Sequence, residues 1–319
     1  MKYWLTTFQT SDLNDMWKVL IATEKPFAAS ASEEIIKVAS GCSDIELRFL
    51  ESYTSFDEIK DAIKDVHALI VRSDKVREEL IQSAPDLKLI IRAGSGYDNI
   101  DLEAATTRGI AVMNTPGQNA NAVAELAFGL MVTIIRNKFN GLPGSELKNK
   151  NLGLHGYGNI GHCMAQIARG FEMNLFAYDP YVTDVIDGVN LVEDISELYS
   201  QCDFISLSIP VNEETKFSIN YDLLQKTKDH TVLVNTARKE IIDEEGLLKI
   251  MSERPDFRYC SDIPPANREK FESLFGERCL ITRKKMGAQT AEANTNAGVA
   301  AITQVIAFFE TGNTRFQIN

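Results

Sequence analysis

A glycine-rich turn constrains the fold of this chain more than any other feature. The segment 152–161 reads LGLHGYGNIG, so an apolar run typical of a strand leads through three close glycines into a helical pattern. Gly156 would permit a tight turn, Gly158 would let backbone approach a pyrophosphate, and Gly161 would let the helix pack on the strand. The spacing therefore predicts a dinucleotide site with the phosphates at the helix N-terminus.

The acid that ends the next predicted strand indicates which dinucleotide would bind. The run 174–179 reads NLFAYD. Asp179 would accept hydrogen bonds from a ribose 2′-hydroxyl and would repel a 2′-phosphate, so the pattern favours NAD over NADP. The alternative is a glycine-rich turn in an unrelated α/β protein, and the order of strand, turn, helix and acid argues against it.

The charge balance excludes several classes of partner. The chain has 319 residues and a net charge of −12, which disfavours nucleic acid and anionic membranes as partners. No run approaches the roughly 18 apolar residues that span a bilayer. The five cysteines form no CxxC pair, as is typical of reduced thiols in a cytoplasmic protein, and we predict no metal site.

Residues 1–17 precede the first strand-like run, which covers residues 18–23. They lack the charged start and apolar core of a signal peptide. We interpret residues 1–17 as a peripheral extension, and a docking role is the alternative.

Strand and helix patterns alternate twice along the chain, over residues 18–115 and again over residues 151–287. Such alternation predicts parallel sheets covered by helices. The fold class is therefore α/β, with two Rossmann-like or flavodoxin-like parallel-sheet domains. Besides the strands at the glycine-rich turn, the predicted strands are Val19–Thr23, Ile45–Leu50, Ala68–Arg72, Leu87–Arg92, Ile110–Asn114, Phe204–Ser208, Val232–Asn235, Arg258–Ser261 and Leu280–Thr282.

Two long helical patterns flank the second region. Asn121–Arg136 is apolar nearly all round, so it must be buried on every face, and a domain junction combined with a subunit interface would bury it. Residues 291–310 form the other pattern, which stops at a plausible C-cap around Gly312.

Three charged residues follow predicted strands of the second region: Arg238, Asp262 and Lys285. Ligands of open parallel sheets bind at the carboxyl ends of the strands, so all three could face a nicotinamide. Each alone could be an ordinary solvated charge. Their common placement beside the glycine-rich turn favours a shared site.

Two arginines end strands of the first region. Arg72 ends one strand, and Arg92 ends the next and leads into Gly94, Ser95 and Gly96, whose N–H groups can form an anion-binding concavity. An arginine fork suits carboxylate and phosphate alike. The alternative is that these arginines only keep the strand ends soluble.

Several segments, in this order along the chain, resemble the D-2-hydroxyacid dehydrogenase family, and most of all its short-form D-3-phosphoglycerate dehydrogenase branch. They are RAGSGYDNID (92–101), NTPG (114–117), GYGNIG (156–161), YDP (178–180), NTAR (235–238) and GAQT (287–290). The resemblance implies a substrate-binding domain built from residues 18–116 and 290–319, and an NAD-binding domain over residues 117–289. It also implies an interdomain cleft and a homodimer joined through the helix after residue 116.

The resemblance also implies residue roles. Arg238 would bind the substrate carboxylate and polarise the reacting carbonyl, and Asp262 would lie beside the nicotinamide. Asn159, Ile160 and Thr236 match cofactor-lining positions. Arg72 and Arg92 match positions that reach the substrate phosphate in phosphoglycerate dehydrogenases.

The chain departs from the family at two positions. The acid–base histidine is replaced by Lys285, and the glutamate that orients it is replaced by Asn267. A lysine needs no carboxylate to select a tautomer, so the two changes are consistent with each other. An ammonium could donate a proton to a developing alkoxide, which makes Lys285 the candidate acid–base group. The alternatives are that Lys285 only attracts an anion while solvent takes the proton, or that it is one solvated charge in the run 283–285.

The leading function is NAD-dependent oxidation of D-3-phosphoglycerate to 3-phosphohydroxypyruvate, at the entry to serine synthesis. The paired arginines favour it because a phosphate requires more positive charge than a methyl or hydroxymethyl group. One alternative is a glyoxylate or hydroxypyruvate reductase of the same family. Another is a non-catalytic NAD(H)-sensing protein, which the lost histidine and glutamate suggest and the retained arginines oppose.

Overall fold

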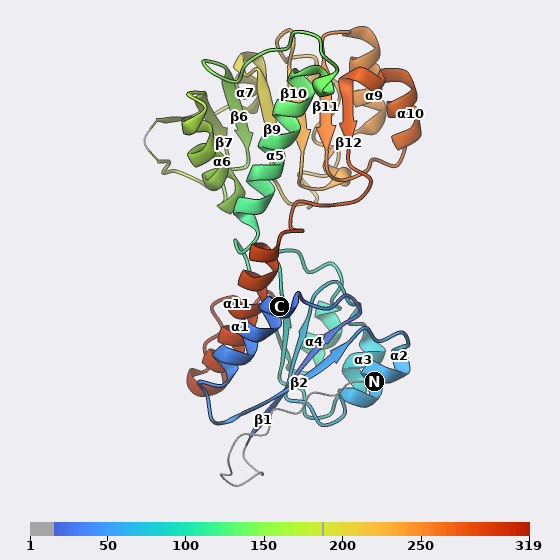
Figure 1. The fold of residues 1–319 in the computed structure, drawn as a ribbon, viewed down its shortest axis with the longest axis vertical. Coiled ribbons are helices and arrows are strands. Elements are labelled where there is room, and N and C mark those ends of the chain that lie inside the picture. Colours follow the sequence, from blue (N-terminus) through green and yellow to red (C-terminus); the bar gives the residue numbers. More distant parts are fainter. Residues whose placement is uncertain (1–15, 187) are drawn as a thin grey trace. The chain divides into compact units, whose positions relative to one another are not determined.

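The computed structural model describes residues 16–186 and 188–319, so most of the predicted extension, residues 1–15, lies outside the described residues. The chain divides into two compact units (Figure 1). Unit 1 contains Met1–Asn119 and Thr290–Asn319, and unit 2 contains Ala120–Gln289. The first division thus falls after Asn119 rather than after residue 116.

Unit 1 is built on a five-stranded parallel sheet in the order β2-β1-β3-β4-β5, which is the flavodoxin-like order. Its strands are β1 (Trp17–Thr23), β2 (Ile45–Glu51), β3 (Ala68–Val71), β4 (Leu89–Arg92) and β5 (Ala111–Asn114). Its helices are α1 (Ala29–Ala39), α2 (Phe56–Ala62), α3 (Glu78–Gln82), α4 (Leu102–Thr107) and α11 (Ala291–Thr311). All five predicted strands are confirmed, each within about two residues at its ends.

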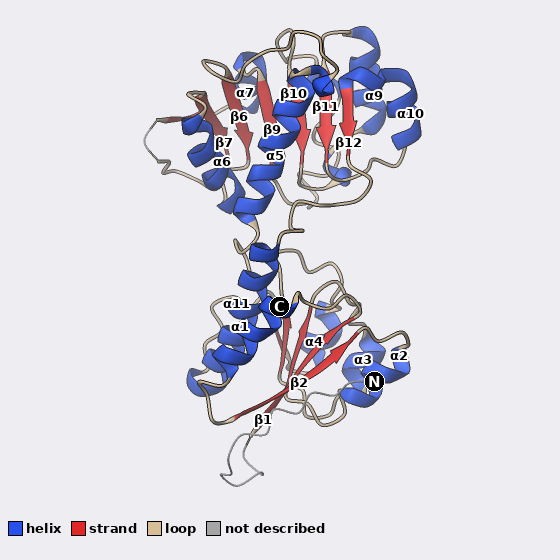
Figure 2. Cartoon of the chain, in the orientation of Figure 1, coloured by secondary structure: helices blue, strands red, loops and turns tan. Residues whose placement is uncertain are grey.

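Helices cover both faces of this sheet, as the strands and helices in Figure 2 show. One core forms beneath α1 and α11, where Ile35 and Ala301 pack against Ile21. A second core forms on the other face beneath α2, α3 and α4. Gly298 permits the close approach of the two long helices, because a Cβ there would lie 2.5 Å from Cδ1 of Ile35.

The first strand corrects the predicted boundary of the extension. Trp17 was assigned to the extension, but it is the first residue of β1 and pairs with Ile45 of β2. Its indole stacks on Phe309 of α11 with ring centroids 4.2 Å apart. The aromatic packing draws Trp17 into unit 1, so an extension can include at most the residues before it.

Unit 2 is built on a seven-stranded parallel sheet in the order β12-β11-β10-β9-β6-β7-β8, the Rossmann-like order. Its strands are β6 (Asn151–His155), β7 (Asn174–Tyr178), β8 (Val189–Leu191), β9 (Phe204–Leu207), β10 (Val232–Asn235), β11 (Arg258–Ser261) and β12 (Cys279–Ile281). The predicted fold class is therefore confirmed for both sheets. β8 was not predicted, because the polar Asn190 lies at its centre and interrupts the apolar run that would mark a buried strand.

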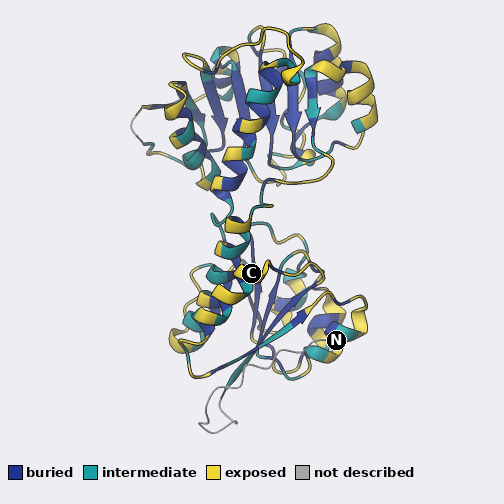
Figure 3. Cartoon of the chain, in the orientation of Figure 1, coloured by how far each residue is buried: buried dark blue, intermediate teal, exposed yellow. Residues whose placement is uncertain are grey.

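The helices of unit 2 are α5 (Ala120–Ile135), α6 (Asn159–Gly170), α7 (Ile195–Gln201), α8 (Tyr221–Leu224), α9 (Glu244–Glu253) and α10 (Arg268–Phe275). Short 3-10 turns cover Asn137–Phe139, Lys239–Ile241 and Gly276–Arg278. In Figure 3 the strands are buried, while the helices expose their outer faces.

Helix α5 is buried along most of its surface but not along all of it in the single chain. Ala124, Met131 and Ile134 are buried, but Asn121, Glu125 and Gly129 form an exposed stripe at helical spacing. The chain by itself therefore leaves this stripe uncovered, and burial on every face requires the predicted interface. The predicted subunit interface, which would cover this stripe, stays a prediction.

The predicted end of α11 is confirmed. Gly312 adopts the left-handed conformation with φ +68°, and its N–H donates to the carbonyl oxygen of Phe308 at 2.9 Å. The N–H of Asn313 donates to the carbonyl oxygen of Ala307, so both residues after α11 bond carbonyl oxygens of its last turn.

Candidate functional site

The glycine-rich turn lies at the carboxyl end of β6, beside the point where the strand order of unit 2 reverses. Gly156 has φ +97°, and a Cβ there would lie 2.9 Å from the carbonyl group of Ser208. A Cβ on Gly161 would lie 2.7 Å from the carbonyl oxygen of Gly156. Gly158 instead faces open space, so its backbone is accessible. The three glycines thus have the tight turn, the open approach and the close packing that the motif predicts.

Helix α6 begins directly after this turn. Its N-cap is Gly158, which supplies no side-chain oxygen for the first N–H groups of the helix. Asn159 is exposed and Ile160 is half-buried. The first turn of α6 therefore presents backbone donors and the positive end of a helix dipole, which fits the pyrophosphate of a dinucleotide.

Asp179 binds the glycine-rich turn itself. Its Oδ2 accepts from the N–H of Tyr157 at 2.9 Å, and its Oδ1 accepts from the N–H of Tyr181 at 3.0 Å. Each carboxylate oxygen has a second lone pair, so Asp179 can still accept a ribose hydroxyl. The acid that was predicted from its spacing is thus also a structural clamp on the turn.

The segment after β10 holds Thr236 and Arg238. The buried side chain of Asn235 accepts from the N–H of Ala237 at 3.0 Å and donates to the carbonyl oxygen of Arg238 at 2.9 Å. These bonds set the turn from which the Arg238 side chain extends. Thr236 is buried, and no described residue hydrogen-bonds its Oγ1, so this hydroxyl is available to a ligand.

Asp262 follows β11 and is 0% exposed. Its Oδ2 accepts from the N–H groups of Met286 and Gly287 at 3.2 and 2.7 Å, so it holds the loop that carries Lys285. Its Oδ1 is buried, with no hydrogen-bond partner among the described residues. Burial raises the pKa of Asp262, although those two N–H groups and the charges of Lys285 and Arg238 act to lower it.

Lys285 is exposed at the end of the loop after β12. Asn267 occupies the position of the missing glutamate, and its side-chain amide donates to Oε2 of Glu244 at 3.2 Å. Asn267 therefore serves the packing of α9 against α10 in this chain. The structure thus groups Arg238, Asp262 and Lys285 at the carboxyl edge of the sheet, as predicted.

Unit 1 has a different arrangement at the carboxyl edge of its sheet. Nε of Arg92 donates to the carbonyl oxygen of Arg72 at 3.0 Å, so the two predicted arginines lie next to each other. Gly94 has φ +147°, and a Cβ there would overlap the guanidinium of Arg92. The Gly94 carbonyl accepts from Thr115, but we find no acceptor within the described ranges for the N–H groups of Gly94, Ser95 and Gly96. These donors remain available to an anion.

The guanidinium of Arg72 is held from several sides. Its Nη1 donates to the carbonyl oxygens of Lys25 and Pro26 at 3.0 and 3.1 Å, and its Nη2 donates to Oδ1 of Asn294. The ring of Phe27 lies 4.9 Å from the guanidinium carbon. Burial lowers the pKa of the Arg72 guanidinium below its ordinary value. Within the described part of the chain, Nε and one N–H of Nη2 keep no protein acceptor, and together they can bind a carboxylate or phosphate.

A family model for D-isomer specific 2-hydroxyacid dehydrogenases, catalytic domain, matches residues 21–319. The chain belongs to this family. It is therefore an oxidoreductase, and the predicted family is confirmed.

Curated relatives include enzymes with different substrates. Hydroxypyruvate reductase of Thermotoga maritima is 37% identical over 280 residues, which cover 82% of this chain and 90% of that enzyme. D-3-phosphoglycerate dehydrogenase of Methanocaldococcus jannaschii is 34% identical over 293 residues, 86% of this chain and 55% of that enzyme. The chain thus spans about half the length of the second relative.

A crystal structure of NAD+-bound 3-phosphoglycerate dehydrogenase from Entamoeba histolytica is also similar. It has a TM-score of 0.87 and 44% identity, and the match covers 95% of this chain and 99% of that one. That relative has a cofactor of the predicted kind, which supports the interpretation of the glycine-rich turn.

Three residues of this dehydrogenase were not predicted to serve the site. Asn235 begins the NTAR motif (235–238), and its position at the end of a predicted strand could have indicated a role in the site. Asp74 and Asn294 carried no such signal, because their partners are distant in sequence: Asp74 binds Glu24 and Tyr53, and Asn294 binds Arg72.

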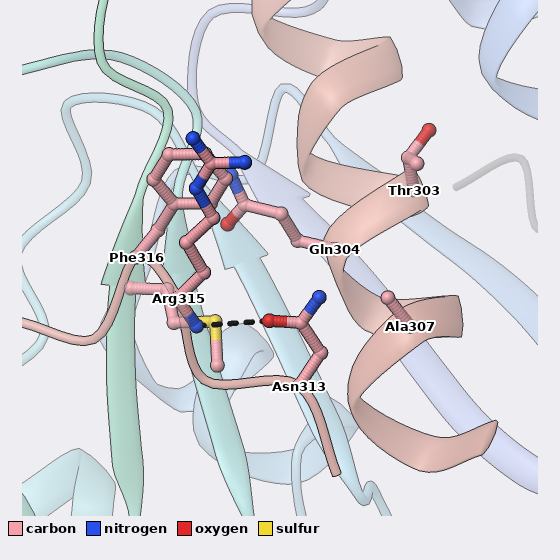
Figure 4. A pocket seen from close by; sticks show the side chains of 7 residues that line it. Thr303, Gln304, Ala307, Asn313, Arg315 and Phe316 are labelled. Carbon is pink, nitrogen blue, oxygen red and sulfur yellow. Dashed lines mark hydrogen bonds between the residues drawn. The ribbon is translucent and has the colours of Figure 1, made fainter. Parts of the chain in front are cut away.

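Three further features of the described residues bear on what else could bind. An apolar cavity of about 120 Å³ lies between α11 and residues 313–316 of unit 1, and none of the predicted site residues lines it (Figure 4). The described residues contain no cluster of histidine, cysteine or acidic side chains that could hold a metal. None of the described helices has the length and apolar character that crossing a bilayer requires.

Proposed function

We propose that this chain oxidises D-3-phosphoglycerate to 3-phosphohydroxypyruvate with NAD, a step at the entry to serine synthesis. The observation that carries the proposal is the pair Arg72 and Arg92, whose side chains converge at the carboxyl edge of the unit 1 sheet. A phosphorylated hydroxyacid has two anionic ends. Arg72 and Arg92 bind the phosphate, and Arg238 binds the carboxylate.

The residues for the cofactor lie in unit 2. The N–H groups after Gly158 bind the pyrophosphate, Asp179 binds the adenosine ribose, and Thr236 and Asp262 bind near the nicotinamide. NAD, when bound, supplies the acceptor for the hydride that leaves the carbinol carbon. Asp179 places a negative charge where NADP would carry a phosphate, so the chain prefers NAD.

Lys285 is the acid–base group of this proposal. During oxidation its neutral amine accepts the hydroxyl proton, and during reduction its ammonium returns that proton. With an unperturbed pKa of about 10.4, the neutral form would cost roughly 4–5 kcal/mol at pH 7.

A glyoxylate or hydroxypyruvate reductase is the second candidate function. It is favoured by the Thermotoga maritima relative, which matches over most of its own length. Such an enzyme would show little preference for a phosphorylated substrate. The third candidate is a non-catalytic sensor, which the missing histidine suggests. Such a protein would bind NADH and turn over no hydroxyacid.

The deciding experiment follows NADH absorbance with 3-phosphohydroxypyruvate, hydroxypyruvate and glyoxylate, first in the parent and then in Arg72→Ala. Loss of a charged hydrogen-bond donor costs about 2 kcal/mol, so kcat/KM for the phosphorylated substrate should fall about thirtyfold. Glyoxylate should lose far less. Lys64→Ala removes a positive charge near the amino end of β3 and is the matched control. An equal loss with glyoxylate would contradict a phosphate role.

We also propose that two copies associate through α5. The exposed stripe of Asn121, Glu125 and Gly129 supports this, and a Cβ added at Gly129 would meet no atom within 4 Å. Gly129→Trp should therefore leave the fold intact and yield monomers by light scattering. Unchanged dimers would exclude this face of α5.

A further inference from the structure

Asp74 is a buried carboxylate in the turn after β3, only 3% exposed. Its Oδ1 accepts from the N–H of Glu24 at 2.6 Å and from the hydroxyl of Tyr53 at 2.9 Å. Its Oδ2 accepts from the N–H of Arg72 at 3.2 Å. A buried carboxylate is tolerated only where hydrogen bonds replace water, and here three neutral donors do so.

The three donors come from three separate loops. Glu24 follows β1, Tyr53 follows β2 and Arg72 follows β3, and these strands are neighbours in the order β2-β1-β3. Asp74 therefore joins three loops at the carboxyl edge of the sheet. Burial first and the charge of Asp74 second raise the pKa of Tyr53, so its hydroxyl keeps the proton that it donates to Asp74.

These bonds reach the guanidinium of Arg72 by two routes. The bond to the N–H of Arg72 sets the backbone from which the side chain extends. The bond to the N–H of Glu24 sets the next residues, Lys25 and Pro26, whose carbonyl oxygens accept from Nη1 of Arg72. Asp74 thus fixes both the backbone from which the Arg72 side chain extends and the carbonyl oxygens that accept hydrogen bonds from its guanidinium.

Asn99 holds the same turn from its other side. Its side-chain amide donates to the carbonyl oxygens of Asp74 at 2.7 Å and of Arg72 at 3.4 Å. The Arg72 carbonyl also accepts from Nε of Arg92. The turn from Arg72 to Asp74 is therefore the common support of both arginines.

We propose that Asp74 is a positioning residue for the anionic substrate, acting through Arg72. This inference rests on the proposed function, in which Arg72 binds the substrate phosphate. Asp74 does not touch the substrate. It holds the guanidinium so that Nε and Nη2 face the anion together, which is the geometry that a bidentate bond requires.

Position and charge predict opposite results when Asp74 is changed to asparagine. The negative charge of Asp74 acts on Arg72, so its removal alone would strengthen the binding of an anion. An asparagine, however, replaces one acceptor oxygen with a donor, which cannot accept from the N–H of Arg72 or Glu24. If position dominates, Asp74→Asn weakens substrate binding.

The test uses the full chain with NADH and 3-phosphohydroxypyruvate. Asp74→Asn should raise KM about tenfold, as expected for loss of one well-placed charged hydrogen bond, with kcat and the dissociation constant of NADH within about twofold. Asp86→Asn removes an exposed acid near the amino end of β4 and should change none of these values. An unchanged or lower KM in Asp74→Asn overturns the inference.

Tyr53→Phe serves if Asp74→Asn does not fold, since it removes one donor and keeps the carboxylate. It should raise KM about threefold, the effect of a neutral hydrogen bond, and an unchanged KM would overturn the inference. The double variant Arg72→Ala/Asp74→Asn separates positioning from a general structural effect. If Asp74 acts through Arg72, Asp74→Asn changes KM little once Arg72 is absent, whereas a full tenfold rise there would contradict it.

Failure of the inference and failure of the proposed function give different results. If Arg72→Ala leaves KM for the phosphorylated substrate unchanged, the proposed role of Arg72 is wrong. If Arg72→Ala raises KM and Asp74→Asn does not, only the positioning role of Asp74 is wrong.

Discussion

The two units of this dehydrogenase use the same architecture with different chemistry at the carboxyl edge. Unit 2 presents main-chain donors there, from the glycine-rich turn and the first turn of α6. Unit 1 presents guanidinium groups, each held by carbonyl oxygens. Parallel sheets thus supply the same kind of edge twice, and the residues after each strand decide which anion it suits.

The difference fits the anion that we propose for each edge. A pyrophosphate joins every dinucleotide, and fixed backbone donors with a helix dipole suit it. A substrate anion varies within the family, and side chains can change without altering the sheet. Unit 2 should therefore tolerate few changes at its glycines, whereas unit 1 should change specificity through its arginines and their supports.

The largest expected effect separates chemistry from binding in unit 2. Lys285→Met should lower kcat by roughly 10²–10⁴-fold, the usual contribution of a general acid–base group, and leave NADH affinity nearly unchanged. The pH–rate profile should lose the ionisation that belongs to this group. Lys284→Met, at the exposed neighbouring lysine, is the control. Near-parent activity in Lys285→Met would remove Lys285 from the mechanism.

A buried histidine should make unit 2 less stable at acidic pH. His155 ends β6 under the glycine-rich turn, and its Nδ1 lies 3.2 Å from the hydroxyl of Tyr199. Burial lowers the pKa of His155 to about 4, although the charge of Asp179 acts to raise it. Between pH 6.5 and pH 4 the unfolded chain therefore binds a proton that the folded chain does not. Stability is unaffected above pH 6.5 and falls progressively below it, by about 3 kcal/mol at pH 4.

Urea unfolding followed by circular dichroism at pH 7 and pH 4.5 checks this sign. His155→Leu should lose less free energy of unfolding on acidification than the parent. His67→Asn in unit 1 is the comparison variant. Partial burial also lowers the pKa of His67, but this side chain is half-exposed, unlike that of His155. Parallel losses in parent and His155→Leu would refute the assignment to unit 2.

The smallest expected effects come from one glycine in each unit. Gly158→Ala should weaken NADH binding about tenfold, because its Cβ would enter the open space expected for the pyrophosphate. Gly94→Ala should instead raise KM for the anionic substrate by about the same factor, because the guanidinium of Arg92 must move.

Fluorescence titration with NADH and steady-state kinetics distinguish the two glycine variants. Gly170→Ala at the end of α6, where a Cβ meets nothing, should alter neither value. If both variants affected both values equally, the division of labour between the units would be wrong.

Much of the fold follows from local patterns. The structure contains the predicted strands because apolar runs bounded by turn residues suffice to mark buried parallel strands. The pattern failed where a local signal was absent or misleading. The apolar run of β8 is interrupted by Asn190, and Trp17 was separated from the strand it begins. The apolar surface of α5 did not reveal which face a single chain leaves exposed.

The candidate site divides in the same way. The glycines, Asp179 and the charges after each strand could be predicted, because their positions are set by neighbours in the chain. Asn267 shows the limit, since the sequence shows the substitution but only the structure shows that its side chain binds Glu244. The assembly around Arg72 was invisible for the same reason, because its partners lie on separate loops.

The sequence by itself determined two parallel α/β sheets, the glycine-rich turn and its preference for a dinucleotide, and the family. Each rests on residue patterns within short segments of the chain. Only the tertiary structure decided that Asp262 is fully buried and that the Arg72 guanidinium meets Asn294 from the far end of the chain. It also joined three loops through Asp74. Such hydrogen bonds depend on strand order and loop packing, which no local pattern encodes.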